Sequence, residues 1–98
     1  MIIIIKRTLS EFSHKHSTAA IPLNRWHEIA KLADWASLND IKKDFSSVDY
    51  VGNDRYVFNI KGNDYRLVTM IFFDVRTIFI RFVGTHKDYD NIKDIKNI

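Results

Sequence analysis

Hydrophobic and polar positions divide the chain into a helical first half and an extended second half. Residues 1–5 form an uninterrupted apolar run in which four of five positions are isoleucine, a pattern typical of a central or well-covered strand. Thr8-Leu-Ser-Glu11 follows and fits a capping box, in which the side chains of Thr8 and Glu11 satisfy free N–H groups at the start of a helix. The pattern therefore predicts a strand and then a first helix.

Two further helices are expected before residue 46. Pro22 suits the first turn of a helix, because the N–H group that proline lacks is not needed there. An apolar stripe at three- and four-residue spacing follows it, formed by Leu23, Trp26, Ile29, Ala30 and Ala33. We expect this stripe, Trp26 included, to pack into the core. Ser37 is a suitable cap for a short third helix with an inward face of Leu38, Ile41 and Phe45.

After Phe45 the pattern becomes extended. Four segments rich in β-branched and aromatic residues predict strands, at Val48–Val51, Arg55–Ile60, Tyr65–Phe73 and Thr77–Val83. Short polar turns would join them into an antiparallel meander, and Asp88–Ile98 would end the chain as a short helix. This order predicts an α+β fold in a single domain over residues 1–98. A small, mainly antiparallel sheet, made of the N-terminal strand and the four-strand meander, would pack against two to three N-terminal helices.

Composition narrows the class of protein without deciding its function. With 98 residues and 46% hydrophobic content, the chain is long enough for one domain with its own core. It has no cysteine, and no apolar run approaches the roughly 20 residues needed to span a bilayer. Residues 1–5 lack the flanks of a signal peptide, so we expect a soluble, cytoplasmic protein. A net charge of +3 allows a polyanionic partner without requiring one.

Strand parity brings several polar residues of the second half together. If the turn at 61–64 joins Ile60 to Tyr65, Asn59 lies opposite Arg66. If the turn at 74–76 joins Phe73 to Thr77, Arg66 lies opposite Gly84 and diagonal to His86. Asn59, Arg66 and His86 would then form one patch, left open by the absence of a side chain at Gly84. The same register places Arg81 opposite Thr69, on the other face of the sheet.

The chemistry available to this patch is limited by what the sequence lacks. It has no cysteine and no metal-binding spacing of histidines, since His14 and His16, two residues apart, would point to opposite sides of a helix. It also has no nucleophile elbow and no glycine-rich phosphate loop, and we expect no cofactor. Arginine for a phosphate, histidine and tyrosine for proton transfer and lysine for charge neutralisation remain. This set suits metal-free RNA cleavage, in which the ribose 2′-OH attacks the adjacent phosphorus.

The residues alone leave other interpretations open. Arg66 is equally compatible with a rim residue paired with an acid, and Tyr89 with an anchor for the C-terminal helix. Lys87, Asp88 and Asp90, taken singly, are typical of a solvated turn. The same patch would also serve a non-catalytic RNA or ribosome binder, and a structural interaction domain is a third alternative. Spacing and composition therefore indicate a polyanion site and no more.

A family resemblance goes further. The segments YVFNIKGNDYRLVTMIFF (residues 56–73) and IFIRFVGTHKDYD (residues 78–90) closely resemble the HigB family of bacterial toxins, which is part of the RelE-like group of type II toxin–antitoxin systems. The resemblance covers about the last half of the chain, and the order of elements before it also fits. It implies a RelE-like fold and an endoribonuclease that cleaves mRNA in the ribosomal A site by 2′-OH attack without a metal. A helix-turn-helix antitoxin of the HigA type would be its partner.

The resemblance also implies residue roles. Arg66 matches the arginine that contacts the scissile phosphate in this group. His86 stands where these toxins place an Arg or His for proton transfer or charge stabilisation. Lys87 and Tyr89 match the Lys and Tyr of the family pattern T-H-K-x-Y and are expected to assist catalysis. The expected RNA contacts are Asn59, Asn63 and Arg81, although RelE has a functional lysine in the place of Asn59, which leaves the general base unassigned.

Overall fold

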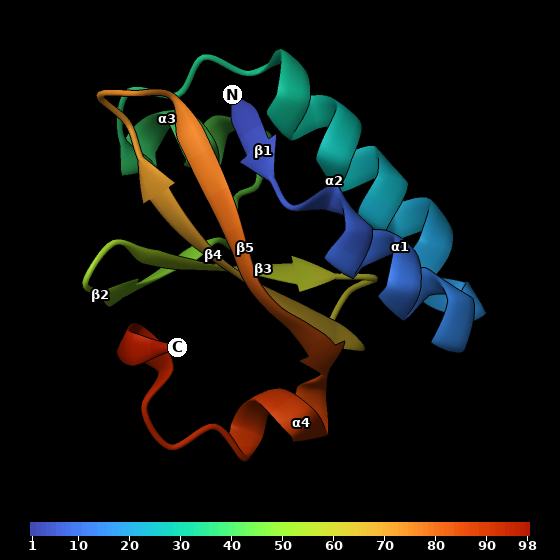
Figure 1. The fold of residues 1–98 in the computed structure, drawn as a ribbon. Coiled ribbons are helices and arrows are strands. Elements are labelled where there is room, and N and C mark those ends of the chain that lie inside the picture. The colour runs from blue at the N-terminus through green and yellow to red at the C-terminus, as the bar shows by residue number, and fades with distance from the viewer.

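The computed structural model describes residues 1–98 as one five-stranded sheet with four α-helices (Figure 1). The strands are β1 (Ile2–Ile4), β2 (Asp49–Gly52), β3 (Arg55–Ile60), β4 (Tyr65–Phe72) and β5 (Thr77–Thr85). The helices are α1 (Lys6–Lys15), α2 (Ala20–Leu32), α3 (Leu38–Asp44) and α4 (His86–Asp90), with 3₁₀ turns η1 (Ser17–Ala19) and η2 (Ile95–Asn97). The predicted α+β class is confirmed.

The strand order in the sheet is β1-β5-β4-β3-β2, and the predicted meander of four antiparallel strands is confirmed. β1 instead lies at an edge, where it runs parallel to β5. The prediction of a central or well-covered strand at residues 1–5 was therefore wrong. Ile3 packs against the core, whereas Ile2 is 60% exposed. A short apolar run looks the same whether it is buried on both faces or on one.

Helix starts differ from the predictions at both ends of the chain. α1 begins at Lys6 with Ile5 in the capping position and no side-chain cap, so the capping box predicted at Thr8 and Glu11 is wrong. β1 ends at Ile4, and the helix starts too soon after it for Thr8 to lie at the cap. The helix expected over Asp88–Ile98 is replaced by α4 and η2. Pro22 does lie in the first turn of α2, as predicted.

The main core lies between the helices and one face of the sheet. Figure 1 shows α1 and α2 along one side of the sheet and the C-terminal segment on the other. Trp26 of α2 is 1% exposed and meets Phe58 of β3 edge to face, with ring centroids 5.4 Å apart. The core role predicted for Trp26 is confirmed, and this aromatic pair contributes to holding the helices on the sheet.

The register between β4 and β5 contains a bulge. The hairpin closes with Phe72 opposite Thr77, so its loop is one residue longer than predicted, and an extra residue in β5 at Arg81 restores the predicted alignment. Arg66 therefore lies opposite Gly84 and beside Asn59, as predicted. Thr69 pairs with Ile80, so the expected pairing of Thr69 with Arg81 was wrong.

The second face of the sheet is covered by the C-terminal segment. α4 packs on β4 and β5, and η2 lies against β2. Val57 and Val68 are buried here, outside the main core. The expected open space at Gly84 is filled, because an added Cβ would lie 2.5 Å from the end of the Phe82 ring and 3.2 Å from Cβ of Asp88. Gly84 allows α4 to approach the sheet closely.

We expect Gly84→Ala to lower the free energy of unfolding by about 1–3 kcal/mol, because the new methyl group overlaps the Phe82 ring. Urea denaturation measures the change. The double variant Gly84→Ala, Phe82→Leu, which removes the end of the ring, should recover much of the loss. An Ala variant as stable as the wild-type protein would contradict this packing.

Candidate active site

Arg66 is the centre of the candidate site. It lies on β4, on the sheet face opposite the main core, and is only 9% exposed. Nη1 donates to the main-chain oxygens of Asn63 and Tyr65, each at 3.2 Å, and Nη2 donates to Oδ1 of Asn63 at 3.3 Å. These three bonds fix the plane of the guanidinium group. No Asp or Glu forms an ion pair with it, so the interpretation as a rim residue paired with an acid does not hold.

The bonds of Arg66 leave part of its donor set free. A guanidinium group has five N–H donors. Both N–H groups of Nη1 and one of Nη2 are used, which leaves Nε–H and the second N–H of Nη2. Nε has no hydrogen-bond partner within the protein and is not fully buried. Two adjacent N–H groups in one plane match two oxygens of a phosphate.

Tyr89 lies beside this guanidinium group. Cζ of Arg66 is 6.0 Å from the centroid of the Tyr89 ring, at the outer limit for a cation–π contact. Burial raises the pKa of the Tyr89 phenol; Asp49 and Asp90 raise it further and Arg66 opposes them. The phenol therefore stays protonated at neutral pH and can donate a proton or a hydrogen bond. Tyr89 both anchors α4 and borders the site.

His86 lies in a different element from the predicted one. β5 ends at Thr85, and His86 is the first residue of α4 rather than a continuation of the strand. Thr85 and Asp88 form a capping box that starts this helix, and the His86 amide donates to the main-chain oxygen of Asp64 at 3.0 Å. The expectation that His86 projects from the strand beside Gly84 was wrong. The chain turns away before it.

The His86 side chain forms an oriented pair with Asp90. Nδ1 lies 2.8 Å from Oδ2 of Asp90, one helical turn further along α4. Both side chains are about half exposed, at 47% and 57%. A carboxylate on Nδ1 fixes the ring and leaves Nε2 available to accept or donate a proton. His86 and Asp90 thus form an exposed acid–base pair on the helix that also carries Tyr89.

The remaining predicted residues fall into two groups. Asn59 pairs with Arg66 across the sheet, Asn63 holds its guanidinium group and Lys87 is exposed on α4 without an ion pair. Arg81 is separate, because its Nε donates to the main-chain oxygen of Ile98 at 3.0 Å. RNA contacts by Asn59, Asn63 and Arg81 remain predictions.

Sequence reasoning missed the partners that position these groups. The pairing of His86 with Asp90 has the i, i+4 spacing of a helix, and Thr85-x-x-Asp88 is a capping-box spacing. Both signals were present in the sequence, but they are informative only once a helix is known to begin at His86. The bonds from Arg66 to Asn63 depend on the geometry of the turn before β4, which the spacing does not reveal.

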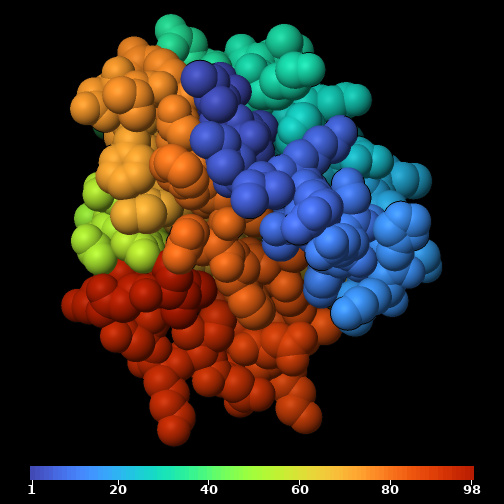
Figure 2. Space-filling model, viewed as in Figure 1, coloured from blue at the N-terminus to red at the C-terminus, as the bar shows by residue number.

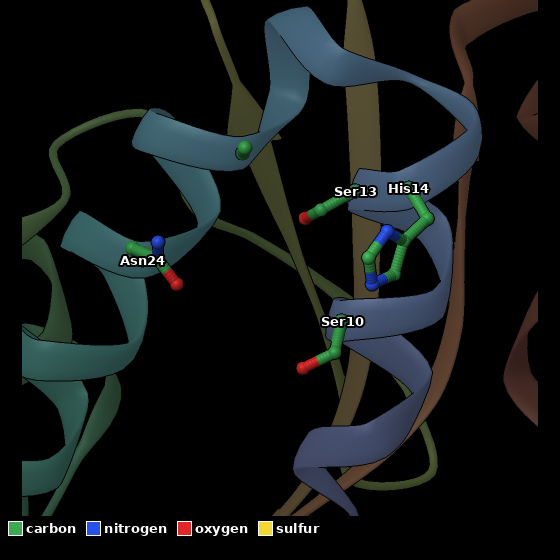
Figure 3. Close-up of a pocket in the computed structure, with 5 residues that line it drawn as sticks. Ser10, Ser13, His14 and Asn24 are labelled. Atoms are coloured by element: carbon green, nitrogen blue, oxygen red, sulfur yellow. The ribbon is translucent and has the colours of Figure 1, made fainter.

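The surface hollows lie away from Arg66. The one shown in Figure 3, of about 260 Å³, lies between α1 and α2 on the helical side. Ser10, Ser13, His14 and Asn24 line it, and it contains no lysine or arginine. His14 lies in α1, whereas His16 lies just after the end of this helix and stacks on Phe12 with ring centroids 4.3 Å apart. The candidate site is thus a surface, which suits a polymer better than a small ligand.

Two further structural findings bear on function. No group of three or more His, Cys, Asp or Glu side chains is close enough to hold a metal ion. None of the helices has the length and apolar character that crossing a bilayer requires.

This small α+β protein, with its arginine-centred site on the face of an antiparallel sheet, matches a known class of toxins. Residues 19–92 match the HigB toxin family, described as the RelE-like toxic component of a toxin–antitoxin system. The mRNA interferase toxin HigB of Escherichia coli K12 is 35% identical over 96 residues, covering 92% of this chain and 88% of the relative. An mRNA interferase HigB of Escherichia coli O6:H1 is 26% identical over 94 residues, covering 94% and 91%. The chain belongs to the HigB family, so the resemblance found in its sequence is confirmed.

We expect the free energy of unfolding to fall as the pH rises above about 10, the ordinary pKa of tyrosine. The folded protein holds the Tyr89 proton more tightly than the unfolded chain, because burial raises the pKa of this phenol, so alkaline pH favours unfolding. Denaturation at pH 8 to 11 should show a smaller fall in Tyr89→Phe. An equal fall in Tyr89→Phe and wild type would contradict the burial of this phenol.

Proposed function

We propose that this chain is a ribosome-dependent endoribonuclease that cleaves mRNA and so inhibits translation. The observation that carries the proposal is the Arg66 guanidinium group, which is fixed by three hydrogen bonds and keeps two N–H groups without a partner. Membership of the HigB family and the names of the relatives as mRNA interferases support it.

The proposed reaction needs no metal. A general base removes the proton of a ribose 2′-OH, the 2′ oxygen attacks the adjacent phosphorus, and the 5′ oxygen leaves with a proton from a general acid. The products are a 2′,3′-cyclic phosphate and a 5′-OH. The free N–H groups of Arg66 would bind the non-bridging oxygens, on which negative charge increases in the transition state. A guanidinium group that is already held in place needs no reorganisation at that moment.

His86 is the proposed general base. Because Nδ1 of His86 is paired with the Asp90 carboxylate, Nε2 can accept the 2′-OH proton, and Asp90 stabilises the imidazolium that results. Tyr89, as a protonated phenol next to Arg66, is the proposed proton donor to the leaving 5′ oxygen. Lys87 would add positive charge beside the RNA. Asn59 and Asn63 would contact the RNA at the edge of the site.

The biological setting is also part of the proposal. We propose that residues 1–98 act as a single toxin domain in the cytoplasm, on mRNA held in the ribosomal A site. A HigA-type helix-turn-helix antitoxin would neutralise it. The family description as the toxic component of a toxin–antitoxin system supports an antitoxin partner. An open site without a substrate pocket is consistent with help from the ribosome in orienting the RNA.

Arg66→Ala and His86→Ala should each lower the rate of cleavage of translated mRNA by about 10²–10³-fold, because each removes one preorganised group. Primer extension on mRNA from an in vitro translation reaction measures cleavage. Arg25→Ala and His14→Ala, which change the same residue types at exposed positions on α2 and α1, should cleave at the wild-type rate.

Two outcomes would contradict the proposal. Wild-type cleavage by both site variants, with circular dichroism unchanged, would exclude Arg66 and His86 as catalytic residues. Translation arrest that survives His86→Ala without any cleavage, but is lost when Lys87 and neighbouring cations are neutralised, would identify a non-catalytic ribosome or RNA binder instead.

Asp90→Ala should lower the cleavage rate by at least about tenfold, because the His86 ring loses the carboxylate that orients it. Asp90→Asn keeps an oxygen acceptor for Nδ1–H but no charge, so its rate should lie between those of Asp90→Ala and the wild type. Single-turnover measurement in the translation assay separates the chemical step from ribosome binding. Equal rates for both variants and the wild type would remove Asp90 from the mechanism.

A further inference from the structure

One side of α2 faces away from the core and has no neighbour within the chain. The helix buries Leu23, Trp26 and Ala30 against the sheet. Its opposite side carries a stripe of four exposed residues at successive spacings of four, three and four, which we call the α2 stripe: Ile21, Arg25, Glu28 and Leu32. Figure 2 shows α2, in cyan to turquoise, along the upper right outline of the molecule.

The two ends of the α2 stripe are apolar. Ile21 is 81% exposed and Leu32 is 87% exposed, which makes them the two most exposed large hydrophobic residues of the protein. They lie 11 residues apart, or roughly 16 Å along the helix axis. Single exposed apolar residues are common on protein surfaces. Here the two share one helix face and enclose a pair of opposite charges.

The two middle residues of the stripe are charged and have no partner. Arg25 and Glu28 lie three residues apart on the helix, a spacing at which opposite charges are able to pair. Neither side chain forms an ion pair with the other or with any other residue of the chain. Both charged groups are therefore available to a partner outside the chain.

The α2 stripe is complementary to itself. Its four positions are symmetric about the point midway between Trp26 and His27. If α2 of a second copy packs against it in the antiparallel direction, Ile21 meets Leu32 of that copy and Arg25 meets its Glu28. A two-fold axis makes each contact occur twice. In the parallel direction Arg25 would face Arg25 of the second copy, so the charges specify the antiparallel arrangement.

We infer that the α2 stripe is the interface of a two-fold symmetric homodimer of this chain. Residues that recur at spacings of four and three form the seam along which two helices pack nearly parallel or antiparallel to each other. The inference goes beyond the proposed function and does not depend on it. Because Arg66 lies on the sheet face opposite the main core and the helices, both candidate active sites stay accessible in such a dimer.

The size of the interface limits its strength. α2 has 13 residues and is about 20 Å long. We expect one pair of helices of this length to bury less than the roughly 1,200 Å² at which stable interfaces begin. The dimer should therefore have a Kd above about 1 µM and dissociate on dilution.

Sedimentation equilibrium of the full chain, over concentrations from below to well above this Kd, tests the inference. Arg25→Glu and Glu28→Arg each replace two attractive contacts by two repulsive ones, so each should weaken the dimer by about tenfold or more. The double variant Arg25→Glu, Glu28→Arg exchanges the charges and keeps them opposite across the axis. It should dimerise with nearly the wild-type Kd.

A mixture of the two single variants gives the sharpest comparison. One variant has two acidic side chains at these positions and the other has two basic ones, so both contacts between unlike copies are attractive. An equimolar mixture should form a heterodimer at least about tenfold more tightly than either variant dimerises alone. Lys42→Glu makes the same change of net charge as Arg25→Glu at an exposed position on α3, and this control should keep the wild-type Kd.

Four outcomes would overturn the inference. A wild-type protein that stays monomeric at every concentration would leave the stripe for another partner, such as a helix of the antitoxin. A dimer that Arg25→Glu does not weaken would have its interface elsewhere. A mixture that associates no better than its components, or a double variant that stays monomeric, would show that Arg25 does not face Glu28 of the second copy. Circular dichroism establishes that each variant remains folded.

Discussion

Pairing of β4 on both of its edges is the constraint on which the rest of the molecule depends. Its backbone bonds to β3 and β5 place Arg66 between Asn59 and Gly84, and alternation sends neighbouring side chains to opposite faces. Leu67 and Ile71 thereby enter the main core under the helices, while Arg66 and Val68 face the C-terminal segment. A slip of one residue would exchange these two sets and remove both the core and the site.

The two buried arginines on this face show how the surroundings of a cation determine its use. Arg66 has main-chain and amide acceptors for three N–H groups and keeps two others free. Arg55 has a neighbouring main-chain oxygen and the Ile98 oxygen, while its Nε is buried without a partner. The first keeps two N–H groups for the phosphate contact that we propose. The second donates only to oxygens of the chain itself.

The sequence predicted the fold class, the meander and the alignment of Arg66 with Gly84, because β-branched runs and polar turns are local signals. The alignment of Arg66 with Gly84 was predicted correctly, although the predicted pairing at the turn between β4 and β5 was wrong. The loop of the β4–β5 hairpin is one residue longer than predicted, and the bulge at Arg81 restores the predicted alignment beyond it. The capping boxes could not be located from the sequence either. The one predicted at Thr8 is absent, and the one at Thr85 was missed. A capping-box spacing caps a helix only if the helix begins there, and that depends on where the preceding strand ends.

The departure of His86 from the strand has a consequence for the site as a whole. A histidine that continued β5 would have been fixed by the sheet, whereas His86, Asp90 and Tyr89 share a helix of five residues. Such a short helix is marginal by itself, so its position depends on the Thr85–Asp88 cap and on the contact of Tyr89 with Arg66. Arg66, the proposed phosphate-binding residue, therefore also helps to position the helix that carries the proposed acid–base residues. Because α4 continues into the segment that Arg55 and Arg81 hold at Ile98, the attachment of that segment to the sheet also bears on the position of α4.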